Sequence, residues 1–507
     1  MQKLIKKIKK RFSKKELLPL FVTSLISFII IIFLHILGTF DFLELKMYDY
    51  KFNVRDDLYK IQRDNLSVSI VYSDDQSYEL LSEKFSYPYP RGKVWAKAIE
   101  NIASLGAKVI VLDYMFDAPD LNTTLSKNVR DNLLKGKYSS LDEKNKLESE
   151  FFVEDNDKLF SQIISKVKKD FGTDVILSGK IVYDPNSTQQ YSILSPTDEI
   201  NTSNGINFGL IDIAQDVDGF LRKYIVYQKL PNTNNYNYSL AVESVLKFFD
   251  EDTKNLAPVY DPLTRKTKIG NNIQIDTYDG KSTFLLNFYG PSSAALGASG
   301  TFENKPLSQI LDDDEICFGK CVWDEDEEIY LPDEELNEVD DDWVNIMRWT
   351  NNKVFDNQIV ILGTSLAEEQ DVKSVPLMRT EAGSFLMPGV DIHANAIQQI
   401  LDSSYISASF NELKINSSNW DKHLFLIIIL ILLTLFIVSP FSTFGSTVGM
   451  AFLIIFWFLF SVGEFVGQFF WMFSYFFENE KIIKVALNES DIIPTIFPMV
   501  SILIPYG

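Results

Sequence analysis

Cysteine and histidine are scarce in this chain, which has two cysteines and three histidines among 507 residues. The cysteines, Cys317 and Cys321, have no second pair of ligands beside them, which argues against a zinc site. The chain also lacks the G-x-S-x-G, P-loop and H-E-x-x-H patterns of common enzyme sites. The sequence therefore predicts no catalytic residue and no cofactor within this chain. Its metal-binding properties stay open, since the acidic stretch 323–343 fits either divalent cations or a solvated loop.

Positive charge is also scarce beyond the first sixteen residues. The net charge is −21, and residues 1–16 carry seven lysines, one arginine and one glutamate, so +7. The remainder then carries −21 − 7 = −28. An acidic body repels phosphates, so we expect no nucleic acid partner. The basic head directly precedes an apolar run, the arrangement that keeps a segment in the cytoplasm.

Long apolar runs are absent between residues 38 and 423 but present on both sides. A run of about 20 apolar residues can cross a bilayer, and the first one, without a cleavage-site pattern, is predicted to be a retained anchor. The predicted divisions are a cytoplasmic head (1–16), transmembrane helices 17–40, 424–440, 445–468 and 491–507, and an extracytoplasmic domain (41–420). This topology predicts a multi-pass protein of the inner membrane, with the lipid bilayer as a partner. The chain stops directly after the last run, so we expect a cytoplasmic part from a longer chain or a partner.

The large hydrophilic segment has the pattern of an α/β domain. Near-continuous Val, Ile and Leu predict strands buried on both faces, and a helix from Gly92 to Leu105 ends at Gly106. Asp218-Gly219 predicts a hairpin turn. The predicted fold is a mainly parallel sheet with crossover helices and an antiparallel hairpin portion, plus a four-helix transmembrane region. The predicted strands are 67–74, 108–116, 174–183, 282–290 and 357–365, and further helices are predicted at 143–169, 237–249 and 387–402.

The stretch YPYPR (87–91) is unusual. Proline fixes its own φ and disfavours helix at the residue before it. The stretch is therefore predicted to be extended and to hold Tyr87 and Tyr89 beside Arg91 at the start of a helix. The tyrosines could equally serve only to cover the edge of the sheet.

A series of short motifs occurs in a fixed order between residues 41 and 405. They are ELKMYDYKF (44–52), YPYPR (87–91), LGAK (105–108), DYMF (113–116), DVDGFLR (216–222), IVILGTS (359–365) and PGVDIHAN (388–395). In this combination the chain resembles the second class of the CHASE family, the cyclase- and histidine-kinase-associated extracellular sensor domains. It departs from the pattern in Lys51, where arginine is usual, in tyrosines for tryptophans at 87 and 89, and in a long acidic insertion at 311–343.

The resemblance implies a sensory receptor with an anchor helix before the domain and three spans after it. Its output would be a cytoplasmic effector, an adenylate cyclase or a kinase, that is absent from this chain. We also expect a homo-oligomer, a dimer formed through the membrane helices. The rival hypothesis, from another class of protein, is a structural or docking component of a cell-envelope assembly that uses the insertion 311–343 as its contact.

Candidate ligand-binding residues follow from the rule that ligands bind beyond the carboxyl ends of parallel strands. They are Asp74, Asp113 and Asp371 after strands, and Arg91 and His393 at helix entries. A structural ion pair between Asp113 and Arg91 is the alternative. If the domain lies outside the cytoplasm, Cys317 and Cys321 are candidates for a disulfide.

Overall fold

The computed structural model describes most of the hydrophilic domain. The described residues are 41–58, 66–135, 153–184, 191–201, 207–216, 218–230, 235–252, 256–262, 264, 266–277, 282–296, 300–313, 315–318, 321–324, 329–332, 353–369, 371–376, 386–406, 454, 455 and 458. The four predicted membrane spans fall outside them, apart from three isolated positions in the third span. Among the helices that the structure describes, none combines the length and apolar character needed to cross a bilayer.

A seven-stranded sheet forms the centre of the domain, and all its neighbouring strands are parallel except β3 and β4. The order is β14-β1-β17-β2-β3-β4, with β5 also paired to β3. The predicted parallel sheet is therefore confirmed, but β1 and β2 are not neighbours, because β17 lies between them. The strands are β1 (Val68–Ser73), β2 (Val109–Met115), β3 (Asp174–Tyr183), β4 (Tyr191–Leu194), β5 (Asn207–Leu210), β14 (Glu303–Pro306) and β17 (Ile359–Thr364).

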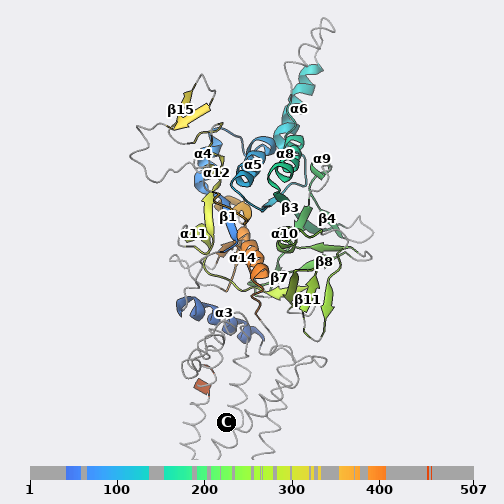
Figure 1. Ribbon diagram of the computed structural model, residues 1–507, viewed down its shortest axis with the longest axis vertical. Coiled ribbons are helices and arrows are strands. Elements are labelled where there is room, and N and C mark those ends of the chain that lie inside the picture. The colour runs from blue at the N-terminus through green and yellow to red at the C-terminus, as the bar shows by residue number, and fades with distance from the viewer. Residues whose placement is uncertain are drawn as a thin grey trace, which may run out of the picture.

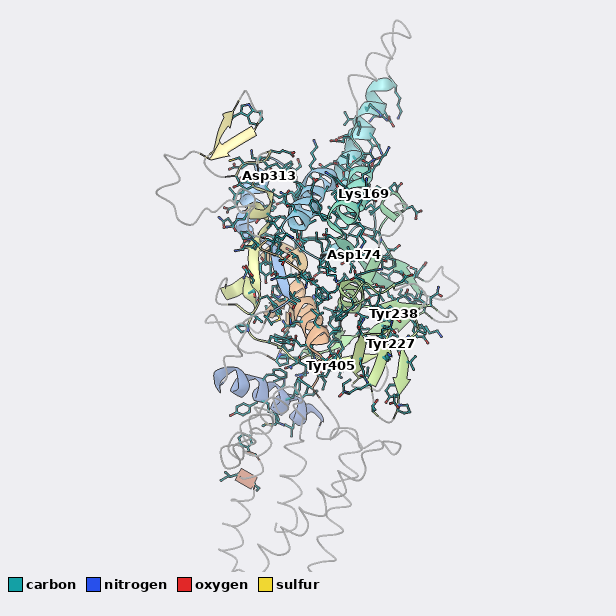
Figure 2. All side chains as sticks on the ribbon, viewed as in Figure 1. Lys169, Asp174, Tyr227, Tyr238, Asp313 and Tyr405 are labelled. Atoms are coloured by element: carbon teal, nitrogen blue, oxygen red, sulfur yellow. The ribbon has the colours of Figure 1, made fainter. Side chains whose placement is uncertain are left out.

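Helices cover both faces of this sheet (Figure 1). Successive strand residues point to opposite faces, so in β17 Ile361 joins one hydrophobic core while Val360 and Leu362 join the other. Apolar side chains fill the space on each side (Figure 2). One face carries α4 (Asp75–Ser82), the π-helical turn η1 (Arg91–Trp95), α5 (Ala96–Ser104), α8 (Asn156–Phe171) and α12 (Leu307–Leu311). The other carries α10 (Leu240–Phe248) and α14 (Gly389–Asp402).

Most of the small antiparallel sheets contribute side chains to the core on the face that α14 covers. The predicted hairpin at Asp218-Gly219 is confirmed, because β6 pairs antiparallel with β7 and Gly219 has a φ of 81°. The strands are β6 (Ala214–Gln215), β7 (Leu221–Ile225), β8 (Tyr227–Lys229), β9 (Tyr236–Tyr238), β10 (Val259–Asp261), β11 (Lys266–Ile269), β12 (Ile273–Asp276), β13 (Thr283–Leu285), β15 (Cys321–Asp324), β16 (Ile329–Pro332), β18 (Val372–Ser374) and β19 (Leu386–Pro388). The antiparallel portion is thus larger than one hairpin.

Two helices mark opposite ends of the domain (Figure 1). The helix α3 (Asp41–Leu58), which the sequence did not predict, lies at one end and buries Tyr48, Asp49 and Phe52 against the body. The helix α6 (Leu121–Leu134) extends away from the other end. Short helical segments complete the fold: α9 (Asp198–Asn201), α11 (Ser293–Leu296) and η4 (Ala367–Glu369).

The close approach of β17 and α14 gives a test of this packing. A Cβ atom at Gly363 would lie 2.5 Å from Cβ of Val390 on α14, so even alanine overfills the interface. We expect Gly363→Ala to lower the free energy of unfolding by about 1–3 kcal/mol. Gly172→Ala is the control, because nothing lies within 4 Å and only its φ of +75° opposes a side chain, at a cost of about 1 kcal/mol. Thermal unfolding of the full chain measures both, and an equal or smaller loss at Gly363 would contradict this packing.

Candidate functional site

The carboxyl ends of β1, β17 and β2 lie side by side, and α14 begins beside them. Two of the predicted residues meet here: Asp113 near the end of β2 and His393 in the first turns of α14. Oδ1 of Asp113 lies 3.8 Å from Nε2 of His393, and both side chains are buried, with 7% and 2% exposed. The structure therefore brings two of the predicted residues together, beside a third residue that the sequence analysis did not name.

That third residue is Tyr224 on β7, which the sequence analysis missed. Its hydroxyl lies 2.5 Å from Nδ1 of His393, with the two rings edge to face. Burial raises the pKa of Tyr224 and lowers that of His393 to about 4. At neutral pH both groups are therefore uncharged, and the Tyr224 hydroxyl shares a hydrogen bond with Nδ1 of the imidazole. The other ring nitrogen, Nε2, faces Asp113.

Burial and neighbouring negative charges determine the protonation state of Asp113. Burial, followed by repulsion from Asp371, raises its pKa to about 7, and Glu369 adds to the rise, while Lys373 opposes it. Asp371, another predicted residue, pairs with Lys373 at 2.9 Å, and its backbone carbonyl accepts from the N–H of Gly389 at the start of α14. The edge of the sheet thus gathers three carboxylates and one lysine around a neutral histidine.

The other predicted residues have separate structural contacts. Asp74 is the N-cap of α4 and accepts from the N–H of Ser77 at 2.8 Å. The predicted ion pair between Arg91 and Asp113 is wrong, because Nη1 of Arg91 lies 2.6 Å from Asp157 on α8. Arg91 is therefore paired with a buried carboxylate that lies 66 residues further along the chain. Cys317 is buried and disulfide-bonded, and Cys321 is the other cysteine of the chain.

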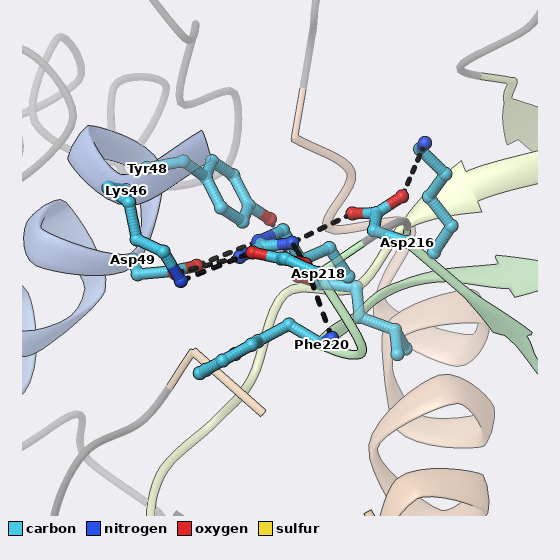
Figure 3. A network of polar contacts seen from close by, with 9 residues as sticks. Lys46, Tyr48, Asp49, Asp216, Asp218 and Phe220 are labelled. Atoms are coloured by element: carbon cyan, nitrogen blue, oxygen red, sulfur yellow. Dashed lines mark hydrogen bonds and ion pairs between the residues drawn. The ribbon is translucent and has the colours of Figure 1, made fainter. Parts of the chain in front are cut away.

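A buried ion network joins α3 to the hairpin turn that precedes β7 (Figure 3). The Arg222 guanidinium, 1% exposed, donates Nε and Nη2 to the two oxygens of Asp49 at 2.8 and 2.7 Å. The turn supplies Asp216 and Asp218, which accept from Arg222 at 2.9–3.0 Å.

Two lysines complete this network, Lys46 at Asp218 and Lys223 at Asp216. Three carboxylates therefore face three cations. Burial lowers the pKa of Arg222, but its hydrogen bonds to Asp49 and Asp218 outweigh that effect and raise it. Hydrogen bonding from Arg222 holds the pKa of Asp218 well below its usual range. All three carboxylates therefore have an ionised arginine as their common partner.

Strand β7 connects the two clusters. Arg222 and Tyr224 are two residues apart on it, so both side chains leave the same face. One contacts α3, and the other contacts His393 at the sheet edge. A shift of β7 therefore changes both clusters together.

A second connection runs along α14, whose 14 residues span about 21 Å. Near its start, Asp391 accepts from Tyr72, Ser292 and the N–H of Ser293. Near its end, Gln399 accepts from the N–H of Asn287 and donates to the carbonyl of Leu285. The next carbonyl, of Leu286, accepts from the Tyr48 hydroxyl of α3 at 3.3 Å. The helix therefore reaches from the sheet edge to the segment against which α3 packs.

Comparison with known proteins supports the resemblance noted in the sequence. A family model described as the CHASE2 domain matches residues 25–437. No curated protein and no solved structure matches the chain. The family match covers most of the chain, so the chain belongs to the CHASE2 family of extracellular sensory domains.

The Arg222 network gives the first test of the site. We expect Arg222→Gln to lower the free energy of unfolding by about 3–5 kcal/mol, because it leaves buried carboxylates without their partner. The control is Lys166→Gln, which removes an exposed pair with Glu100 on the other side of the sheet and is expected to cost under about 1 kcal/mol. Chemical unfolding of the full chain measures both. Equal costs would show that the network does not hold the domain together.

Asp113 gives a test by pH. Its folded pKa of about 7 exceeds the ordinary 3.8, so the protonated form favours folding and that contribution is lost as pH rises through 7. Asp113→Asn never ionises. Its stability relative to the natural protein should therefore rise between pH 4 and 7 by a few kcal/mol and then level off. The opposite dependence of His393, stabilising as pH rises from 4 to 6.5, is common to both proteins. A difference that stays constant with pH would contradict the burial of this carboxyl.

Proposed function

We propose that this member of the CHASE2 family is a transmembrane sensory receptor of the bacterial inner membrane. Its α/β domain lies in the periplasm and detects a stimulus, and its membrane helices pass the signal to a cytoplasmic effector, an adenylate cyclase or a kinase. The support is family membership together with the sequence pattern of a basic head and apolar runs on both sides of one large domain. A dimer formed through the membrane helices belongs to the same proposal.

The observation that carries the proposal is the link between the sheet edge and α3. The helix α3 begins at Asp41, directly after the first predicted span, 17–40. It is joined to β7 by the bidentate pair of Asp49 and Arg222, and β7 contacts the sheet-edge cluster through Tyr224. A ligand that moves His393 or Asp113 therefore moves an element fastened to α3.

The strength of the link fits this role. Moving a two-state equilibrium from mostly off to mostly on takes about 5.5 kcal/mol of differential binding. Breaking a buried ion pair costs about 3–5 kcal/mol, so the Asp49–Arg222 contact can carry most of that energy without separating. The signal then reaches the bilayer as a tilt or rotation of α3, a movement that rigid helices transmit.

The rival role, a docking component of an envelope assembly, rests on the insertion 311–343. Most of it lies outside the described residues, and the hairpin of β15 and β16 is its main described part beyond Phe318. The described contacts that join α3, β7 and the sheet edge favour the sensory role.

Topology tests the proposal directly. Val259→Cys places a thiol at a position 64% exposed on β10, and Ser13→Cys places one in the basic head. In spheroplasts, an impermeant maleimide should label Cys at position 259 before lysis and at position 13 only after it. The natural chain, with its own two cysteines, is the blank. Labelling in the reverse order would place the domain in the cytoplasm and remove the receptor.

A further inference from the structure

Five aromatic rings form a continuous cluster at the carboxyl edge of the sheet. They come from α4, the YPYPR stretch, η1 and β2, and consecutive ring centroids lie 4.4–6.3 Å apart in the order Tyr78, Tyr87, Tyr89, Trp95, Tyr114. The cluster is graded from solvent to core. Tyr78 and Tyr87 are 40% and 49% exposed, whereas Tyr89 and Trp95 are 3% and 6% exposed. The rings meet edge to face or tilted, so they do not stack on each other's faces.

The charge beside these rings is negative. Glu369 accepts a hydrogen bond from the Tyr87 hydroxyl, and after burial its charge contributes to the raised pKa of Tyr89 and of Tyr114. Asp371 and Asp113 lie nearby, and both Asp371 and Glu369 repel the ionised form of Asp113. The positive charge of Lys373 lowers the pKa of Asp113, but Lys373 is already paired with Asp371. Arg91 is paired with Asp157 and lies over Phe116.

Two hydroxyls of the cluster, those of Tyr89 and Tyr114, are buried and have no hydrogen-bond partner among the described residues. Of the two residues, Tyr89 lies beside the exposed ring of Tyr87. A buried hydroxyl without a partner costs free energy. The Tyr87 ring is 5.2 Å from that of Tyr89 and carries the hydroxyl that donates to Glu369, so Tyr89 adjoins both the exposed ring and the carboxylate.

We propose that this cluster, Tyr78, Tyr87, Tyr89, Trp95 and Tyr114 with Glu369, binds a small organic cation, an alkylated or protonated amine. Aromatic faces attract such cations, the carboxylate supplies the counter-charge, and the Tyr89 hydroxyl is available to accept from an ammonium N–H. A metal ion fits less well, because no group of three or more acidic, histidine or cysteine side chains among the described residues converges as metal ligands. An anion is disfavoured by the carboxylates.

This inference names the ligand class of the proposed receptor and so rests on the proposed function. It also connects with the site, because a cation beside Glu369 would relieve the like-charge repulsion at Asp113 and favour its ionised form. Asp113 faces His393, which contacts Tyr224 on β7. Binding at the rings would thus change the charge at the start of the connection to α3.

Titration of the full chain in detergent with tert-butylammonium chloride at neutral pH tests the proposal, with sodium chloride keeping the ionic strength constant and tert-butanol as the neutral molecule of the same shape. Isothermal calorimetry should show saturable binding of the cation and none of the alcohol. Glu369→Gln and Tyr87→Leu should each weaken binding about tenfold. The matched control is Tyr183→Leu, because Tyr183 forms a similar edge-to-face pair with Tyr191 on β3 and β4, away from the cluster.

Three results would overturn the inference: no saturable binding of tert-butylammonium, equal binding of tert-butanol, or an equal loss of binding in Tyr183→Leu. Thermal unfolding of each variant separates lost binding from lost folding, and Glu369→Gln, at a partly exposed side chain, provides the test if Tyr87→Leu unfolds. If the cation does not bind, the result of the maleimide labelling experiment is unaffected. Failure of the topology experiment removes the receptor while leaving amine binding intact, so the two proposals fail independently.

Discussion

The buried guanidinium of Arg222 is the contact on which the rest of this structure depends. Removing this charge from water costs free energy. Its hydrogen bonds offset that cost, because Asp49 and Asp218 each accept with both carboxylate oxygens and Asp216 accepts with one. Asp49 comes from α3 and the other two from the turn before β7. Release of α3 would therefore remove two of these five hydrogen bonds to the buried guanidinium, which makes α3 part of the folded body.

The sheet determines where a ligand could act on that body. Because β1, β17 and β2 are parallel neighbours, their carboxyl ends present Asp113 and the residues after β17 at one edge. The helix α14 starts at this edge and ends near the segment that contacts Tyr48 of α3. The helix α14 and the strand β7 therefore both connect this edge to α3. A change in charge at the edge can shift α3 through either element.

Local patterns in the sequence predicted the four longest strands well and their order poorly, and of the predicted strand 282–290 only β13 (Thr283–Leu285) forms. Continuous Val, Ile and Leu identify β1, β2, β3 and β17, because strands buried on both faces leave no polar alternation. The insertion of β17 between β1 and β2 depends on a segment about 250 residues away, and no local pattern encodes it. The helix α3 was missed because its sequence, DFLELKMYDYKFNVRDDL, mixes charged and aromatic residues without a clear apolar stripe.

The same distinction holds for the site. The placement of Asp113 and His393 at one edge could be predicted, because each follows a strand or opens a helix at the carboxyl edge of the sheet. Their partner Tyr224, 169 residues before His393, could not, nor could Asp157 as the partner of Arg91. Asp49 and Arg222 both lie in motifs of the family resemblance. They are 173 residues apart, so no local pattern predicts their contact.

Hydrogen exchange at α3 in the full chain tests most directly whether Arg222 fastens this helix to the domain. In the natural protein the amides of Asp41–Leu58 should exchange slowly, as part of the folded body. In Arg222→Gln they should exchange much faster, while those of β1 and β17 stay protected under conditions where the variant remains folded. Unchanged exchange at α3, or faster exchange spread equally over α3 and the sheet, would contradict the account.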